Sequence, residues 1–235
     1  MRRALAPLAL AAAILALCAA PVAAGEYDPG TVPPEATATP ERSGRVLRVG
    51  PRARGGIQRA VDRARQGDTV RIARGVYRGN VVIRGASKRG LRVVADGATL
   101  RGRVEIRDTA HVTLQGLSLR GGGVVIRDVD RYALRSVRVQ GAPGNGIDVR
   151  RSVGGSLRRV LSAGNGAAGI ALGGTPQRIR AVRTFIREST VRDNAVGIAL
   201  DRMRFVTVSR VRLPGNREPV LAVDSTDIVL DALEA

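Results

Sequence analysis

The stretch Gly55–Arg84, GGIQRAVDRARQGDTVRIARGVYRGNVVIR, changes its hydrophobic period halfway along. In its first half, apolar residues recur at the i, i+3, i+4, i+7 spacing of one helical face, at Ile57, Ala60, Val61 and Ala64. A glycine follows where such a helix would end, and from Val70 onwards apolar and polar residues alternate as they do in strands. The stretch therefore predicts a short amphipathic helix, followed directly by strands, that lies as a cap across the open end of a stack of strands.

Beyond this stretch the sequence repeats in units of about 22 residues, and such a period is typical of stacked architectures. A V/I-x-V/I/L triplet starts seven times, and the starts are 23, 20, 23, 23, 28 and 23 residues apart. Alternation is kept within every unit, which favours a coil of short parallel strands over a propeller or a leucine-rich repeat. We therefore expect equivalent triplet residues, such as Ile147, Ile170 and Ile198, to lie directly over one another. The triplets are Val81–Ile83, Val104–Ile106, Val124–Ile126, Ile147–Val149, Ile170–Leu172, Ile198–Leu200 and Leu221–Val223.

The order of these features resembles the beginning of the pectin-lyase-like superfamily of right-handed parallel β-helices. In that family the pattern I-Q-x-A-V-x-x-A marks the capping helix, and G-D-T-V-x-I-x-x-G-x-Y opens the first turn of the coil. The resemblance implies an all-β fold, a single right-handed parallel β-helix with an N-terminal capping helix. It leaves the activity open, because lyases, hydrolases, epimerases and non-catalytic proteins share this fold. The matching residues are Ile57, Gln58, Ala60, Val61, Ala64, Gly67, Asp68, Thr69, Val70, Ile72, Gly75 and Tyr77.

The N-terminal residues predict export. Two arginines precede an apolar run from Leu5 to Ala20, and small residues lead up to Ala24, which is the pattern of a secretory signal peptide. We expect residues 1–24 to be removed by cleavage after Ala24, and the protein to be periplasmic or secreted. Residues 25–44 are rich in Pro, Thr, Ala and Gly without an apolar period, which predicts a disordered linker. The β-helix domain would then span 45–235, and no second apolar run predicts a membrane span.

The charge of the chain indicates an anionic partner. The formal net charge is +19, and removal of the two leader arginines would leave +17. An exported basic protein meets acidic polysaccharides and other anionic envelope polymers, whereas export argues against genomic nucleic acid. Only three Tyr and two Phe are present, with no Trp. Because neutral sugars are usually held on aromatic faces, we expect an acidic glycan held by charge.

The residue that follows each triplet should point outward, and it is arginine in the first four units. Arg84, Arg107, Arg127 and Arg150 would then form a column of guanidinium groups, which match carboxylates and sulfates. The 28-residue spacing places about five extra residues in a loop near 175–182, and Arg178 and Arg180 in that loop would extend the substrate-binding surface. The alternative is a solvated ladder of ion pairs without a ligand.

A second candidate site follows this column. Asp148 and Arg150 border small residues at Ala171, Gly173 and Ala199, with Asp201 beyond them. The resemblance to the lyases implies Arg150 as a proton-abstracting base, with Asp148 and Asp201 beside it. It also implies that Asp201 and Asp224, expected next to each other in the outward column, could share a calcium ion, although no cofactor is required. The alternative is that the small residues only keep the sheet flat.

Other catalytic patterns do not occur in the sequence. The N-T-D, paired-Asp and G-H-G elements of polygalacturonase-like hydrolases are missing, and the single histidine, His111, is expected in a surface turn. Three functions therefore fit: a binder of acidic polysaccharide, a small lyase or epimerase acting on uronic-acid polymers, and a structural or adhesive module. No second amphipathic helix follows the last strand, so we also expect a homodimer through an uncapped C-terminal turn.

Overall fold

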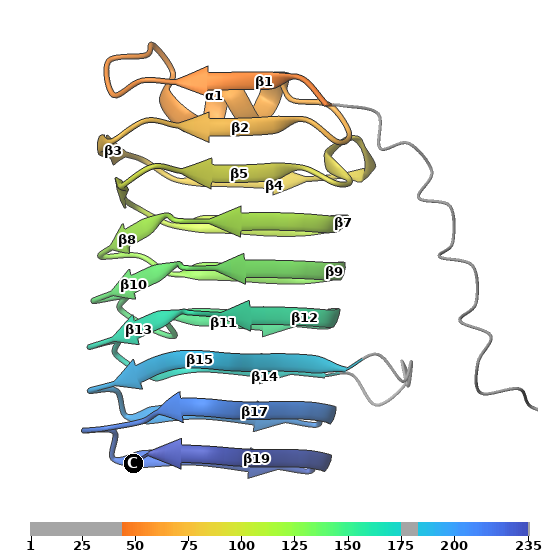
Figure 1. The fold of residues 1–235 in the computed structure, drawn as a ribbon, viewed down its shortest axis with the longest axis vertical. Coiled ribbons are helices and arrows are strands. Elements are labelled where there is room, and N and C mark those ends of the chain that lie inside the picture. Colours follow the sequence, from red (N-terminus) through yellow and green to blue (C-terminus); the bar gives the residue numbers. More distant parts are fainter. Residues whose placement is uncertain (1–43, 175–182, 235) are drawn as a thin grey trace, which may run out of the picture. The chain divides into compact units, whose positions relative to one another are not determined.

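The computed structural model describes residues 44–174 and 183–234, which belong to one compact unit. These residues form a parallel β-solenoid of about eight turns, called rungs below (Figure 1). Within these ranges, one α-helix, α1 (Gly56–Arg63), and one short 3-10 helix, η1 (Ala86–Lys88), accompany the strands. The predicted all-β parallel solenoid is therefore confirmed. No helix in the described ranges combines the length and the apolar character needed to cross a bilayer.

Each complete rung contributes strands to three faces, which we call A, B and C. Face A stacks β4 (Val81–Arg84), the first part of β7 (Val104–Gln115) and of β9 (Val124–Arg135), β11 (Ile147–Arg150), β14 (Ala168–Gly173), β16 (Val196–Asp201) and β18 (Glu218–Val223). Face B stacks β1 (Val46–Val49), β2 (Thr69–Ile72), β5 (Arg92–Ala95), the later parts of β7 and β9, β12 (Val153–Arg158), β15 (Thr184–Arg192), β17 (Arg204–Arg212) and β19 (Thr226–Glu234). Face C stacks β3 (Gly75–Arg78), β6 (Ala98–Arg101), β8 (Ser118–Arg120), β10 (Arg138–Gln140), β13 (Leu161–Ala163) and the ends of β15, β17 and β19.

The core is a set of aliphatic columns inside the coil. Ile147 pairs with Ile170, and Ile170 pairs with Ile198, each fully buried, so the predicted stacking is confirmed. Neighbouring parallel strands lie about 4.8 Å apart, and each inward side chain therefore rests on its equivalents above and below. This arrangement forces the alternate residues of every strand into columns on the outside.

The seventh triplet is displaced by one residue from its predicted place. Ile198 pairs with Val220, so the inward residues of β18 are Val220 and Ala222 rather than Leu221 and Val223. Four consecutive apolar residues, 220–223, fit both phases of a two-residue alternation. The hydrophobic pattern alone could not fix the register here, and the turn before β18 decides it.

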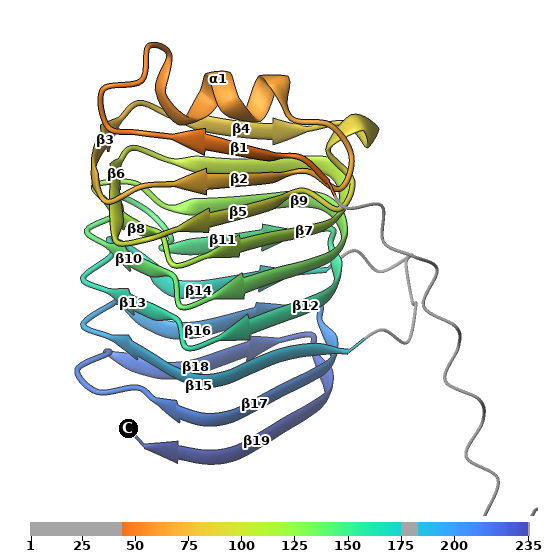
Figure 2. The same ribbon diagram turned by 45° about the horizontal axis from the view of Figure 1, so that its top comes forward.

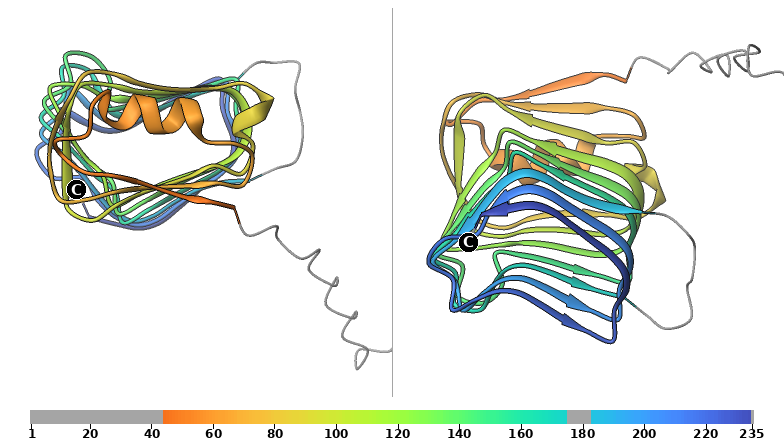
Figure 3. Two further views of the ribbon diagram at one scale, coloured as in Figure 1. Left: turned by 90° about the horizontal axis from the view of Figure 1, so that it is seen from above. Right: turned by 60° about the horizontal axis from the view of Figure 1, so that its bottom comes forward.

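The helix α1 packs against the first strand of face A. Its buried residues Ile57 and Val61 face inward. Figures 2 and 3 show the helix above the interior that the strands enclose. The side-chain amide of Gln58 pairs with the outer edge of β4: Val82 N donates to Gln58 Oε1 at 2.6 Å, and Gln58 Nε2 donates to Val82 O at 3.1 Å. Gln58 thereby satisfies backbone groups that would otherwise form an open strand edge.

Two further polar residues of the N-terminal pattern have structural partners. Asp68 is buried and accepts hydrogen bonds from the backbone N–H groups of Arg45 and Arg65, both at 2.8 Å, and from the Arg45 guanidinium at 3.1 Å. The Tyr77 hydroxyl lies 2.9 Å from the carbonyl oxygen of Ala73. These contacts explain why polar groups stand at two buried positions in this end of the coil.

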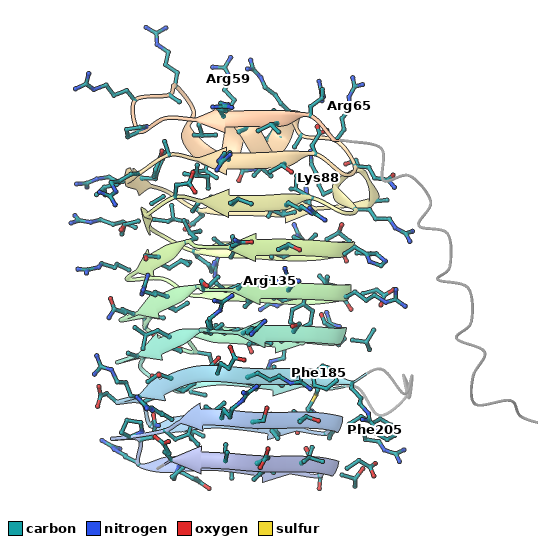
Figure 4. All side chains as sticks on the ribbon, viewed as in Figure 1. Arg59, Arg65, Lys88, Arg135, Phe185 and Phe205 are labelled. Carbon is teal, nitrogen blue, oxygen red and sulfur yellow. The ribbon has the colours of Figure 1, made fainter. Side chains whose placement is uncertain are left out.

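The single lysine of the sequence closes the end of α1. Lys88, labelled in Figure 4, is buried, and its ammonium group donates to the carbonyl oxygens of Asp62 and Ala64 (Figure 4). A cation at this end satisfies carbonyl groups that have no partner within the helix and complements the helix dipole.

An asparagine ladder, Asn165, Asn194 and Asn216, runs through the turn between faces C and A. Asn165 Nδ2 donates to Asn194 Oδ1, and Asn194 Nδ2 donates to Asn216 Oδ1, each at 2.9 Å. Glycines precede the neighbouring face A triplets because the ladder passes close to the backbone there. A Cβ atom at Gly169 would lie 2.8 Å from Asn194 Nδ2 and 2.2 Å from a methyl group of Val191. The turn and the triplet therefore fit only when this position has no side chain.

Fifteen non-glycine residues among those described have positive φ, between 47° and 58°. They lie at the corners where the chain passes from one face to the next, and His111 is one of them, with φ of 56°. Such backbone is costly for most residues with a side chain. Five of the fifteen are Asp and one is His, which adopt it more readily, whereas at the other corners the stack imposes it.

The last rung is the most exposed part of the coil. Val229 and Leu230 of β19 are 53% and 49% exposed, whereas Val206 and Val208 in β17 are fully buried. No described element lies over β18 and β19 on their outer side. This end therefore presents strand edges and apolar side chains together.

Candidate functional site

The predicted column of arginines exists on face A. Arg84 pairs with Arg107, Arg107 with Arg127, and Arg127 with Arg150 in one continuous parallel register. We call these four residues the arginine column. Because their strands are neighbours, the Cα atoms of successive members are about 4.8 Å apart, and four positive side chains leave the sheet side by side.

Ion pairing alternates along the arginine column. Arg107 Nε lies 3.4 Å from Glu105 Oε1, and Arg150 Nε donates to Asp148 Oδ1 at 2.8 Å. The residues at the corresponding places beside Arg84 and Arg127 are Val82 and Val125, and neither arginine forms an ion pair within the described parts of the chain. Uncompensated guanidinium groups therefore stand on every second rung, roughly 10 Å apart on the strand spacing.

The pair at Arg107 is weaker than its distance suggests. Arg107 Nε is buried and has no hydrogen-bond partner, although the Glu105 carboxylate is near. A buried donor without an acceptor is costly, so the nearby Glu105 carboxylate compensates the charge of Arg107 without satisfying this N–H group.

A hollow of about 370 Å³ lies beside the arginine column, between face A and the turn that comes from face C. Arg103 and Arg127 bring positive charge to it, while Asn145 and Asp148 contribute polar groups. Asn145 Nδ2 lies 3.4 Å from Asp148 Oδ1. Much of the remaining wall is glycine backbone from Gly121–Gly123, so a chain-like ligand could approach the backbone closely.

The structure brings Arg150, Asp148 and Asp201 into one electrostatic cluster. The Arg150 side chain lies over Gly173, where a Cβ atom would come within 2.9 Å of Arg150 Cδ. Asp201 receives two hydrogen bonds from Arg202, at 2.9 and 3.1 Å. These bonds lower the pKa of Asp201, and the charge of Arg150 adds to the effect. Each charged group of the cluster already has a protein partner.

The open zone of small residues expected beyond Arg150 is largely closed. Ala171 is only 6% exposed, and Gly173 is buried beneath the Arg150 side chain. Ala199 alone of the three is partly exposed. The reason is that a long arginine side chain folds over the neighbouring glycine instead of leaving the sheet, and the sequence pattern does not determine this.

The prediction that Asp201 and Asp224 lie next to each other in one outward column is wrong. Asp201 pairs with Val223, and Asp224 stands at a corner with φ of 47°. The one-residue displacement of β18 is the cause. Among the described residues no group of three or more His, Cys, Asp or Glu side chains is arranged to hold a metal ion.

Arg178, Arg180 and His111 are not part of the arginine column or of the cluster around Arg150 as the structure describes them. Arg178 and Arg180 lie outside the described residues. His111 lies at a corner of β7 and is partly exposed, away from the arginine column. Asp128, which follows Arg127, binds Arg151 through two bonds, at 2.7 and 2.9 Å.

Sequence reasoning missed a second set of arginines on face B. Arg135, Arg158 and Arg187 pair with one another in register on β9, β12 and β15. Their signal in the sequence is an arginine directly after an inward aliphatic residue, in Leu134-Arg135, Leu157-Arg158 and Ile186-Arg187. The same alignment that revealed the face A column, applied to the second strand of each repeat, would have found them.

Comparison with known protein families finds no family that matches this chain, and comparison with curated proteins finds no match either.

Proposed function

We propose that this chain is an exported β-helix protein, periplasmic or secreted, that binds acidic polysaccharide or another anionic envelope polymer along the arginine column. The register of Arg84, Arg107, Arg127 and Arg150 on successive rungs carries this proposal. A polymer that runs along the solenoid axis would place its acid groups over these guanidinium groups. The neighbouring hollow with Arg103 supports the proposal, because it offers a chain-like ligand a second surface beside the column. The binding needs no cofactor.

We also propose that the chain belongs to the pectin-lyase-like superfamily, with a right-handed coil and α1 as its N-terminal cap. The contacts of Gln58, Asp68 and Tyr77 support this, because the residues that carry the resemblance have structural partners at the start of the coil. The signal-peptide pattern of residues 1–24 supports export.

The alternating ion pairs indicate which polymers would bind best. Glu105 and Asp148 compensate every second member of the arginine column, so the surface repeats its positive charge over two rungs. A sugar in an extended polysaccharide is about as long as one strand spacing. A polymer with one acid group on every second sugar would therefore match the column better than one with an acid on every sugar.

The test is retention of the full chain on immobilised acidic polysaccharide at a fixed ionic strength. We expect the double variant Arg84→Ala/Arg127→Ala to lose retention. The matched control is Arg78→Ala/Arg101→Ala, which removes the same charge from two exposed, paired positions on face C. Equal losses in both variants would show that net charge alone binds the polymer, and the structural or adhesive alternative would then take its place.

The second candidate function is a small lyase or epimerase for uronic-acid polymers. The cluster of Arg150, Asp148 and Asp201 favours it, since these groups meet on one face. Incubation with polygalacturonate and alginate, with and without calcium, would reveal unsaturated sugars by their ultraviolet absorbance or epimers by their NMR signals. Products that disappear in Arg150→Ala would establish catalysis, and the absence of products would leave binding as the function.

A further inference from the structure

The face B arginines surround a hollow of about 420 Å³ that is separate from the arginine column. Arg135, Arg158 and Arg187 stand on three successive rungs. The equivalent residues on the rungs before and after them are uncharged, Gln115 and Ser209. Arg135 lies on one of the front strands in Figure 4 (Figure 4). The positive charge is therefore concentrated over three rungs instead of following the whole face.

The corner residues add further charge to the same hollow. Arg159 and Arg210 line it from the turn between faces B and C, together with Glu188. Five arginines and one glutamate thus face one volume. Groups of like charge at this spacing repel one another, so an anion between them stabilises the arrangement.

Glu188 shows how this hollow holds an oxyanion. Arg158 donates to both Glu188 carboxylate oxygens, at 3.0 and 3.1 Å, and Arg210 adds a contact of 3.3 Å. The bonds from Arg158 lower the pKa of Glu188, and the charges of Arg210 and Arg159 also contribute. One carboxylate therefore compensates part of the charge and leaves the rest for a ligand.

Arg187 is already positioned for binding. Its guanidinium carbon lies 4.3 Å from the centre of the Phe185 ring, a cation–π contact that restricts the side chain before any ligand arrives. Phe185 is labelled in Figure 4, on the strand that also carries Arg187. Arg135, Arg159 and Arg187 form no ion pair within the described residues.

We propose that this hollow, called the face B site, binds a phosphate group of an anionic ligand. Three arginines without a carboxylate partner surround it, and a phosphate monoester carries about −1.5 to −2 charge at neutral pH with three acceptor oxygens. The planar guanidinium fork matches such a tetrahedral oxyanion. A single carboxylate would leave more of the positive charge uncompensated. The face B site is thus a second binding site, on a different face from the arginine column.

The experiment is calorimetric titration of the full chain with inorganic phosphate, in a phosphate-free buffer of constant ionic strength, with acetate as the reference anion. We expect saturable binding of one phosphate per chain, about tenfold tighter than acetate. Arg135→Ala and Arg187→Ala should each weaken it about tenfold, as expected for loss of one charge-assisted hydrogen bond. Glu188→Gln should strengthen it, because the competing carboxylate charge is removed.

The control is Arg48→Ala, which removes an exposed arginine from the first strand of the same face and should leave phosphate binding unchanged. All the substituted side chains are outward, so circular dichroism melts should coincide with that of the parent protein. Equal binding of phosphate and acetate, or an equal loss in Arg48→Ala, would overturn the proposal. Polysaccharide retention through the arginine column is a separate readout: it should be unchanged in Arg135→Ala, and either proposal can fail without the other.

Discussion

Replacing Asn194 by alanine tests whether the asparagine ladder holds the rungs together. Asn194 is 4% exposed, and its Oδ1 accepts from the Asn165 backbone N–H at 3.0 Å and from Asn165 Nδ2 at 2.9 Å. Its Nδ2 donates to Arg192 O at 2.8 Å and to Asn216 Oδ1 at 2.9 Å. Asn194→Ala therefore leaves the backbone N–H and one side-chain N–H of the buried Asn165 without their acceptor, while the other side-chain N–H keeps Ser162 Oγ at 3.0 Å. Each unsatisfied buried group costs about 1–3 kcal/mol, so we expect the free energy of unfolding to fall by roughly 2–6 kcal/mol.

The measurement is urea denaturation followed by far-ultraviolet circular dichroism, since urea does not screen the many surface charges as guanidinium would. Hydrogen exchange should show faster exchange at the Asn165 amide, because in a solenoid the loss concentrates in adjacent rungs. The matched control is Asn80→Ala. Asn80 is exposed and accepts one bond, from the Arg103 backbone N–H at 3.0 Å, so its loss should cost only about 0.5–1.5 kcal/mol. A cost for Asn194→Ala no larger than that of the control would refute the reasoning.

The hydrogen bonds and the Arg45 charge at Asp68 outweigh its burial and lower its pKa below the ordinary 3.8; stability present above that pH should be lost as pH falls through the lowered pKa, and urea titrations should show a smaller loss in Asp68→Asn. Gly173→Ala should displace the Arg150 side chain, which lies within 2.9 Å of the added methyl group, and a crystal structure or altered polymer retention would show this. Glu105→Gln combined with Asp148→Asn should release two column arginines and raise the affinity for polygalacturonate relative to hyaluronan; an unchanged ratio would contradict the spacing argument. The exposed apolar residues of the last two strands predict an end-to-end homodimer, and sedimentation that shows a monomer at all micromolar concentrations would contradict it.

The outward arginines show which features of the candidate site the sequence pattern could predict. An arginine after each aliphatic triplet predicted the arginine column, and the register confirms it. The alternating ion pairs were not foreseen, because they depend on how each side chain folds back on its own strand. The closing of the Gly173 surface by Arg150 has the same origin. The sequence pattern says little about which rotamer a long charged side chain adopts.

The asparagine ladder and the corners belong to the tertiary structure alone. Asn165, Asn194 and Asn216 are about one repeat apart in sequence, but only stacking brings their amides within 2.9 Å of one another. Positive φ at Arg131 and Phe205 likewise reflects the geometry of the coil rather than a preference of the residue.

Local alternation of apolar and polar residues, recurring about once per rung, determined which side chains are inside, because burial of apolar surface depends only on the face a residue occupies. Which residue rests on which equivalent was decided by the tertiary structure, because the length of each turn sets the register. Residues 220–223 are all apolar, so the alternation does not determine which of them point inward. The turn before β18 sets the register, and it pairs Asp201 with Val223 rather than with Asp224.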